Sequence, residues 1–281
     1  MKFLSYSTGG EASFGLAAEA GVIDLKSRLG VGSLKALIAA GGLGRAAGVA
    51  GEAPDHAWDA VTFLPVIPDP DKIICIGINY EEHRAETGRS AVAHPTVFTR
   101  FADTQVGHGQ PIIKPKVSET VDYEGELAVV IGREARGVAE ADALSHVAGF
   151  ACYNDVSIRD FQRHTTQFTP GKNFPGTGPF GPYLVTPDEV GALGPQRIQT
   201  RLNGQVVQDS TLEHMIFDVP KLIAYLSLWT LLRPGDVIVT GTPGGVGAAR
   251  TPPLWMKPGD EVEVEIDRVG LLKNRVAAEE S

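Results

Sequence analysis

Residues 121–131, Val-Asp-Tyr-Glu-Gly-Glu-Leu-Ala-Val-Val-Ile, place two carboxylates directly before a run of apolar residues. Side chains alternate between the two faces of a β-strand, so Glu124 and Glu126 point the same way, roughly 7 Å apart along the chain. Taken alone, this pattern fits an exposed acidic strand best. The apolar residues that follow favour a strand that enters the core, where neighbouring carboxylates need solvent or a cation.

The rest of the chain alternates short apolar runs with turns, and its 33 Gly and 19 Pro residues favour many strands over long helices. One helix is clear, Val219–Leu232, because its apolar residues recur at helical spacing and Pro234 follows it. Strands and helices do not alternate regularly, which argues against a doubly wound parallel sheet. The sequence therefore predicts an α+β fold. The predicted strands are Lys72–Ile78, Glu126–Ile131, Ala148–Tyr153, Gln199–Leu202, Val237–Thr240 and Glu261–Ile266.

A small N-terminal α/β domain is predicted at residues 1–66, followed by a larger domain at residues 67–281. Two short strands (Lys2–Tyr6 and Gly21–Leu25) precede a helix at Ser33–Ala40, which the next two glycines end. The segment Pro65–Pro70 is rich in proline, which is typical of a joint between domains.

Composition excludes several classes of protein. The 281 residues are 43% hydrophobic and carry a net charge of −9, without the Lys/Arg clusters that nucleic acids or anionic membranes require. No apolar run approaches the ~20 residues that span a bilayer, and the first residues turn polar after four, so we expect no signal peptide. Cys75 and Cys152 lie in apolar segments, so we expect two buried thiols and a cytoplasmic protein.

Asp155 supplies a third carboxylate, at the end of the apolar run Val147–Tyr153. In isolation, Asn154-Asp155 also fits a turn or a helix cap. Three carboxylates without a neighbouring cluster of Cys or His favour Mg²⁺ or Mn²⁺ over Zn²⁺.

His83 and Glu86 lie in a short predicted helix that Asn79 begins and Gly88 ends. Residues three apart share one face of a helix, so the carboxylate can orient the imidazole and stabilise its protonated form. Such a pair can act as a general base for water. A solvated helix with a surface histidine is the alternative.

Lys172 lies in a turn between two aromatic residues, where it can stabilise an oxyanion or remain a surface ammonium. The surrounding segment lacks the first Gly and the Ser/Thr of a phosphate-binding loop. Residues 237–247 form a strand and a Gly-rich loop that can approach an anion, but without the features of an NAD site. No Gly-x-Ser-x-Gly elbow is present, which argues against a serine nucleophile.

The order and spacing of these motifs resemble the fumarylacetoacetate hydrolase family, metal-dependent enzymes that process oxo-acids in catabolism. The resemblance runs from about Lys72 to about Ile266. It rests on Gly77-Ile-Asn-Tyr-x-x-His83-x-x-Glu86, Asp122-Tyr-Glu-Gly-Glu-Leu127, Asn154-Asp155-x-x-x-Arg159-Asp160-x-Gln162, Gly171-Lys172-x-Phe174, Leu202-Asn-Gly204, Leu231-x-x-Pro-Gly-Asp236 and Thr240-Gly-Thr-Pro-x-Gly-Val-Gly247.

The resemblance implies a mixed β-sheet roll with short helices, in a homodimer. It implies three roles for the site residues: metal ligands (Glu124, Glu126, Asp155), catalytic groups (His83, Glu86, Lys172) and substrate contacts (Arg159, Gln162, Thr242). Some animal members add an upstream aspartate as a ligand, but residues 73–79 contain none. The segments that flank Lys172 also contain more Pro and Gly than is usual in the family, so the resemblance does not define the size of the substrate or the shape of the lid.

The function predicted from these features is metal-dependent hydrolysis of a C–C bond in a 2,4-dioxo acid, such as an acylpyruvate, fumarylpyruvate or maleylpyruvate, in aromatic catabolism. His83, oriented by Glu86, would activate the water, and Lys172 would stabilise the oxyanion. The same chemistry allows a 2-hydroxyhepta-2,4-diene-1,7-dioate isomerase or an oxaloacetate decarboxylase. An idle oxo-acid or metal-binding module is the alternative outside enzymes, and the His83/Glu86 pair argues against it.

Overall fold

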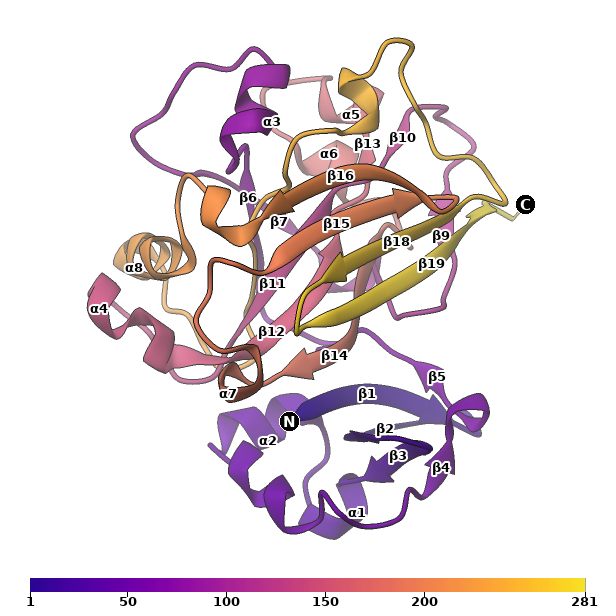
Figure 1. The fold of residues 1–281 in the computed structure, drawn as a ribbon, viewed down its shortest axis with the longest axis vertical. Helices are drawn as coiled ribbons and strands as arrows, with labels where there is room; N and C mark the ends of the chain where they lie inside the picture. Colours follow the sequence, from indigo (N-terminus) through magenta and orange to yellow (C-terminus); the bar gives the residue numbers. More distant parts are fainter. Residues whose placement is uncertain (281) are drawn as a thin grey trace.

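The computed structural model describes residues 1–280 and is built largely from β-strands (Figure 1). In chain order the strands are β1 (Lys2–Thr8), β2 (Glu11–Ala18), β3 (Gly21–Asp24), β4 (His56–Ala57), β5 (Thr62–Phe63), β6 (Ile73–Gly77), β7 (Thr96–Arg100), β8 (Gln105–Val106), β9 (Ile112–Lys114), β10 (Val121–Asp122), β11 (Gly125–Ile131), β12 (Val147–Asn154), β13 (Ser157–Ile158), β14 (Gly178–Val185), β15 (Arg197–Leu202), β16 (Gln205–Thr211), β17 (Val237–Val239), β18 (Glu261–Ile266) and β19 (Gly270–Ala278).

These strands form two main sheets. The larger has the order β4-β3-β2-β1-β14-β12-β11-β17-β6-β7, with β5 beside β1 and β8 beside β14. The smaller has the order β16-β15-β18-β19-β9, and β10 pairs with β13 separately. Most pairs are antiparallel, while β17 and β6 are parallel. The predicted mixed sheet with short helices is confirmed.

Helices are short and surround the sheets (Figure 1). The α-helices are α1 (Lys26–Leu29), α2 (Leu34–Ala39), α3 (Glu81–Glu86), α4 (Glu140–Ala143), α5 (Arg159–Gln162), α6 (Thr169–Lys172), α7 (Pro187–Val190) and α8 (Val219–Trp229). The 3-10 helices are η1 (Leu43–Gly48), η2 (Trp58–Ala60), η3 (Ala102–Thr104), η4 (Leu144–His146), η5 (Leu212–His214) and η6 (Gly247–Ala249). Within residues 1–280, none is long and apolar enough to cross a membrane.

Two helix predictions can be compared directly with the structure. Ser33 caps α2 by accepting a hydrogen bond from the Ala36 backbone at 3.1 Å, close to the predicted start. The predicted helix Val219–Leu232 was too long, because α8 ends at Trp229. Thr230 is extended, and Leu232 instead exchanges backbone hydrogen bonds with Ala135 at 3.0 Å.

The core has two layers on either side of β11 and β12. On one side, Leu127 of β11 belongs to a buried cluster with Val264 of β18 and Leu222 of α8. On the other side, Val130 of β11 belongs to a cluster that extends to Leu34 of α2. Both faces of β11 are therefore covered by packed side chains, which hold the start of this strand in a fixed position.

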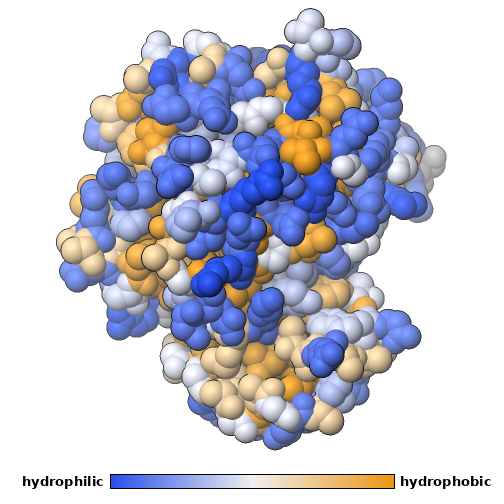
Figure 2. Space-filling model, viewed as in Figure 1, coloured by the Kyte–Doolittle hydropathy of each residue, from blue (hydrophilic) through white to orange (hydrophobic). Residues whose placement is uncertain are grey.

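The N-terminal residues form a lobe at the lower end of the molecule (Figure 1). Its strand β1 pairs antiparallel with β14, so the larger sheet continues from the lobe into the main body. Indentations at the sides mark where the lobe meets the body, and hydrophilic residues cover much of the visible face of the body (Figure 2). The boundary between residues 66 and 67 stays a prediction.

Candidate metal centre and active site

The two glutamates of the opening motif lie at the start of β11, which β12 and β17 flank. Both are buried, so the alternative of an exposed acidic strand is excluded. The strand begins at Gly125, so Glu124 directly precedes it and Glu126 is its second residue. A Cβ at Gly125 would lie 2.1 Å from Thr200 Oγ1, so the smaller sheet packs closely against the face of the strand opposite the two carboxylates.

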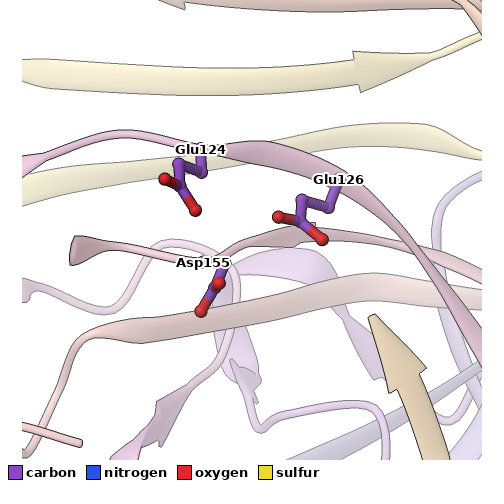
Figure 3. A group of neighbouring side chains, drawn as sticks. All are labelled: Glu124, Glu126 and Asp155. Atoms are coloured by element: carbon purple, nitrogen blue, oxygen red, sulfur yellow. The ribbon is translucent and has the colours of Figure 1, made fainter. Parts of the chain in front are cut away.

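Asp155 joins the two glutamates because the end of β12 is held against the start of β11. The Asp155 backbone N–H donates to the Glu124 carbonyl at 2.8 Å, and the Glu124 N–H donates to Asn154 Oδ1 at 3.0 Å. One oxygen from each of the three carboxylates lies within 4.8 Å of the others. Figure 3 shows all three side chains pointing into the same space.

Three buried cations contact this group. Lys172 Nζ lies 2.5 Å from both Glu124 Oε2 and Asp155 Oδ2. Arg159 Nη2 lies 2.6 Å from Glu124 Oε1, and Arg100 Nη1 donates to Asp155 Oδ1 at 2.7 Å. Both oxygens of Glu124 and of Asp155 are thus engaged by positive charge.

Glu126 differs from the other two carboxylates because no cation contacts it within residues 1–280. Its Oε2 accepts a hydrogen bond from the Gly241 backbone at 2.5 Å. Burial, with the charges of Asp155 and Glu124, raises the pKa of Glu126 well above its ordinary value. Burial also disfavours the charged form of Glu124, but Arg159 and Lys172 outweigh it and lower that pKa to about 2.

The three carboxylates suit a hard divalent cation. They supply oxygen ligands only, which is the donor set of Mg²⁺ and Mn²⁺. The raised pKa of Glu126 also shows a local shortage of positive charge, which a bound cation would supply. The ligand roles of Glu124, Glu126 and Asp155 stay a proposal.

His83 and Glu86 meet on α3 as the sequence predicts. His83 Nδ1 lies 2.7 Å from Glu86 Oε1, and Glu86 Oε2 accepts the Gly245 backbone N–H at 2.8 Å. His83 is only 5% exposed, which excludes the surface-histidine alternative. The predicted capping of α3 by Asn79 was wrong. Its side-chain amide instead donates hydrogen bonds to the backbone carbonyls of Phe217 and Thr240, and so connects the start of α3 to the loop after β17.

Lys172 is neither in a turn nor a surface ammonium. It is the last residue of α6 and is 1% exposed. Burial lowers the pKa of a lysine, but the charges of Asp155 and Glu124 outweigh it and raise the pKa of Lys172. The ammonium therefore stays charged beside the carboxylates.

A single cavity of about 570 Å³ brings most of the predicted residues together. Those lining it are His83, Glu86, Glu124, Glu126, Arg159, Gln162, Lys172 and Thr242. Asp155 lies just behind this surface, against Lys172.

The three predicted substrate contacts are already engaged by protein groups. Arg159 Nε donates to Asp122 Oδ2 at 2.8 Å, and its Nη1 donates to Gln162 Oε1 at 3.0 Å. Thr242 donates its hydroxyl proton to the Gly125 carbonyl at 3.0 Å. Their contact with substrate stays a proposal.

Sequence reasoning missed four charged residues at or behind the cavity. Asp122 anchors Arg159 and accepts the Gly247 backbone N–H at 2.7 Å, and Arg100 holds Asp155. Arg89 and Arg163 line the cavity itself. Asp122 lies inside the opening motif, which was the one available signal.

Residues 72–277 match the family model described as fumarylacetoacetate (FAA) hydrolase C-terminal. The human protein named oxaloacetate tautomerase FAHD2B, mitochondrial, is 43% identical over 230 residues, which are 81% of this chain and 73% of the relative.

Two solved structures share the whole fold. A putative HpcE protein from Mycobacterium smegmatis superposes with a TM-score of 0.91 at 34% identity, covering 100% of each chain. Maleylpyruvate hydrolase from Sphingobium sp. SYK-6, in complex with manganese(II) and pyruvate, superposes with a TM-score of 0.83 at 25% identity, again covering 100% of each chain.

Proposed function

The chain belongs to the fumarylacetoacetate hydrolase family, and we propose that it is a metal-dependent enzyme that interconverts the keto and enol forms of a small dicarboxylic oxo-acid of the oxaloacetate type. One observation carries this proposal: the His83–Glu86 pair faces the same cavity as the carboxylate group. The human relative named an oxaloacetate tautomerase supports the choice of reaction. The C–C bond hydrolysis that we predicted from the sequence becomes the second candidate.

Residues of this chain account for the proton transfer. A divalent cation held by Glu124, Glu126 and Asp155 would polarise the oxo group. Because Glu86 engages His83 Nδ1, Nε2 is the nitrogen left to take a proton from the carbon next to the oxo group. Glu86 stabilises the imidazolium, which then returns the proton to the oxygen, so no atom is gained or lost.

The alternative hydrolysis uses the same dyad on water instead of carbon. Its support is the size of the cavity, because about 570 Å³ exceeds what a four-carbon acid needs. The likeness to maleylpyruvate hydrolase also supports it. Two other enzymes would use the same cavity: an oxaloacetate decarboxylase, and an isomerase that acts on a dienedioate. A binding module without activity would not need the His83–Glu86 pair.

A side-by-side panel tests the reaction. Enol oxaloacetate would be followed by its ultraviolet absorbance, corrected for the uncatalysed rate, beside an acylpyruvate and a dienedioate. We expect EDTA to abolish turnover, Mg²⁺ or Mn²⁺ to restore it, and oxaloacetate to give the highest kcat/KM. If the acylpyruvate wins by about tenfold, or ~1.4 kcal/mol of transition-state preference, hydrolysis replaces tautomerisation.

The dyad can be tested separately from the metal. His83→Ala should lower turnover by roughly 100-fold, the usual scale for a lost general base, and leave Mn²⁺ affinity nearly unchanged. Calorimetry and rate measurements on one preparation give both values. Parental turnover in this variant would place the proton transfer elsewhere.

Two further predictions from the sequence remain proposals. We propose a homodimer, by analogy with the family, which light scattering can test. We also keep the cytoplasmic location as a proposal, although the human relative is named mitochondrial.

A further inference from the structure

Four lysine and arginine side chains line the cavity beside the carboxylates, and two of them are already paired. Lys172 contacts Glu124 and Asp155, and Arg159 contacts Asp122 and Glu124. Protein carboxylates therefore offset the charges of both, which leaves little net positive charge on them for a further carboxylate of the substrate.

Arg89 and Arg163 differ from those residues. Both line the cavity, and neither guanidinium has a hydrogen bond or an ion pair to any residue within positions 1–280. An arginine presents a planar set of N–H donors that matches a carboxylate. Elimination therefore leaves these two side chains as the free anion-binding groups of the cavity.

The backbone fixes where both side chains start. The Arg89 N–H donates to the Arg84 carbonyl at 3.1 Å, and the Arg89 carbonyl accepts from Arg84 Nη1 at 3.2 Å. Arg163 follows α5, and its N–H donates to the carbonyls of Arg159 and Asp160 at 3.2 and 3.1 Å. Because the backbone of each arginine is held in place while its guanidinium is unpaired, the side chain can bind a ligand without breaking a contact within the protein.

The charge balance of the cavity favours a substrate with two negative groups. Glu86, Glu124 and Glu126 line it on the acidic side, and Lys172, Arg159 and a bound divalent cation would together offset their charges. The arginines at positions 89 and 163 then add positive charge that no protein carboxylate neutralises. The surplus attracts an anion in addition to the oxo-acid group at the metal.

We propose that Arg89 and Arg163 bind the second carboxylate of a dicarboxylic oxo-acid and so select diacids over monoacids. This inference rests on the proposed function in placing the first carboxylate and the oxo group at the metal. It names the substrate class of the site independently of whether the bound acid is enolised, cleaved or isomerised.

A matched pair of ligands tests the inference by binding alone. 2-Oxoglutarate and 2-oxopentanoate share the oxo-acid group and the chain length, but one ends in a carboxylate and the other in a methyl group. Calorimetry on the Mn²⁺-loaded protein would give both Kd values. We expect the parent to prefer 2-oxoglutarate by about tenfold or more, as a charge-assisted pair provides.

Arg89→Gln and Arg163→Gln should each reduce that preference by about tenfold and leave the Kd of 2-oxopentanoate within about twofold. Arg275→Gln is the matched control, because this arginine is 71% exposed on β19 and does not line the cavity. Melting temperatures would confirm that all three variants fold.

An unchanged preference in both cavity variants overturns the inference, and so does equal weakening of both ligands, which would place the arginines at the oxo-acid group. If oxaloacetate is not tautomerised but the preference still collapses, diacid selection stands and the reaction is different. If tautomerisation is found and the preference is unchanged, the inference alone fails.

Discussion

Glu126 should make metal binding release a proton. Its carboxyl is 2% exposed, lies beside Glu124 and Asp155, and has the Gly241 N–H as its hydrogen-bond donor. Burial and repulsion from Asp155 and Glu124 raise its pKa well above the ordinary value of 4.5. The metal-free protein therefore holds a proton on this carboxyl above the pH at which an exposed glutamate has lost it.

The size of the effect follows from proton linkage. A carboxylate must lose its proton to ligate a metal, so below the raised pKa each bound ion displaces one proton. Metal affinity should then rise about tenfold, or ~1.4 kcal/mol, for each unit of pH and level off above that pKa. Glu124 adds no slope at neutral pH, because its pKa is already lowered to about 2.

The same proton affects stability in the absence of metal. Above pH 4.5 the unfolded chain loses the proton from Glu126, whereas the folded protein keeps it up to the raised pKa. The folded state binds more protons in this window, so the contribution of Glu126 to stability falls as pH rises through it. A bound cation should remove this loss, because it stabilises the ionised carboxylate.

Calorimetry can count the proton directly. Mn²⁺ would be titrated at a series of pH values above 4.5 in buffers with different ionisation enthalpies, and the dependence of the observed heat on buffer gives the number released. Glu126→Gln is the control, because it removes the titrating carboxyl and keeps His83. We expect the variant to release fewer protons than the parent at the lower pH values of the series, and to bind the metal more weakly. Identical proton release in both proteins, or an affinity that does not change with pH, would refute the reasoning.

Two further predictions concern stability. Arg100→Met leaves Asp155 Oδ1 without its buried cation and should lower the free energy of unfolding of the metal-free protein by about 3 kcal/mol. Arg100→Lys should recover part of this loss. Urea unfolding measures both variants, and an unchanged free energy in Arg100→Met would mean that Lys172 alone neutralises Asp155. Gly171→Ala should cost about 2 kcal/mol or more in the same assay, because its Cβ would lie 2.4 Å from the Gln162 backbone nitrogen, whereas Gly44→Ala, with nothing within 4 Å, should be close to neutral.

Local pattern indicated which carboxylates share a strand face and that His83 can meet Glu86, while their roles came from the family resemblance. Glu124 and Glu126 lie at the start of one buried strand, and Asp155 follows its neighbour, so short stretches of sequence determine where each side chain starts. His83 and Glu86 are three residues apart, which is sufficient to bring them together on any helix. The α+β class also followed from the many short apolar runs, whereas the mixed sheet was implied by the family resemblance.

Contacts between distant segments were not predictable in the same way. Arg100 meets Asp155 across 55 positions, and Lys172 meets Glu124 across 48. No periodicity in the sequence encodes such pairs, because they depend on how β7 and α6 are arranged around β12. The sequence around Lys172 therefore fitted an oxyanion-stabilising group and a surface ammonium alike, and only the folded chain shows it buried against two carboxylates.

These distant contacts make the three carboxylates unequal. Lys172 bridges Glu124 and Asp155, while Arg159 and Arg100 hold their outer oxygens, so both carboxylates are held in position without a metal. Glu126 has no such support, and its ionisation has the most to gain when a cation arrives. In the proposed metal site, two carboxylates are thus preorganised, and the third would make metal binding depend on pH.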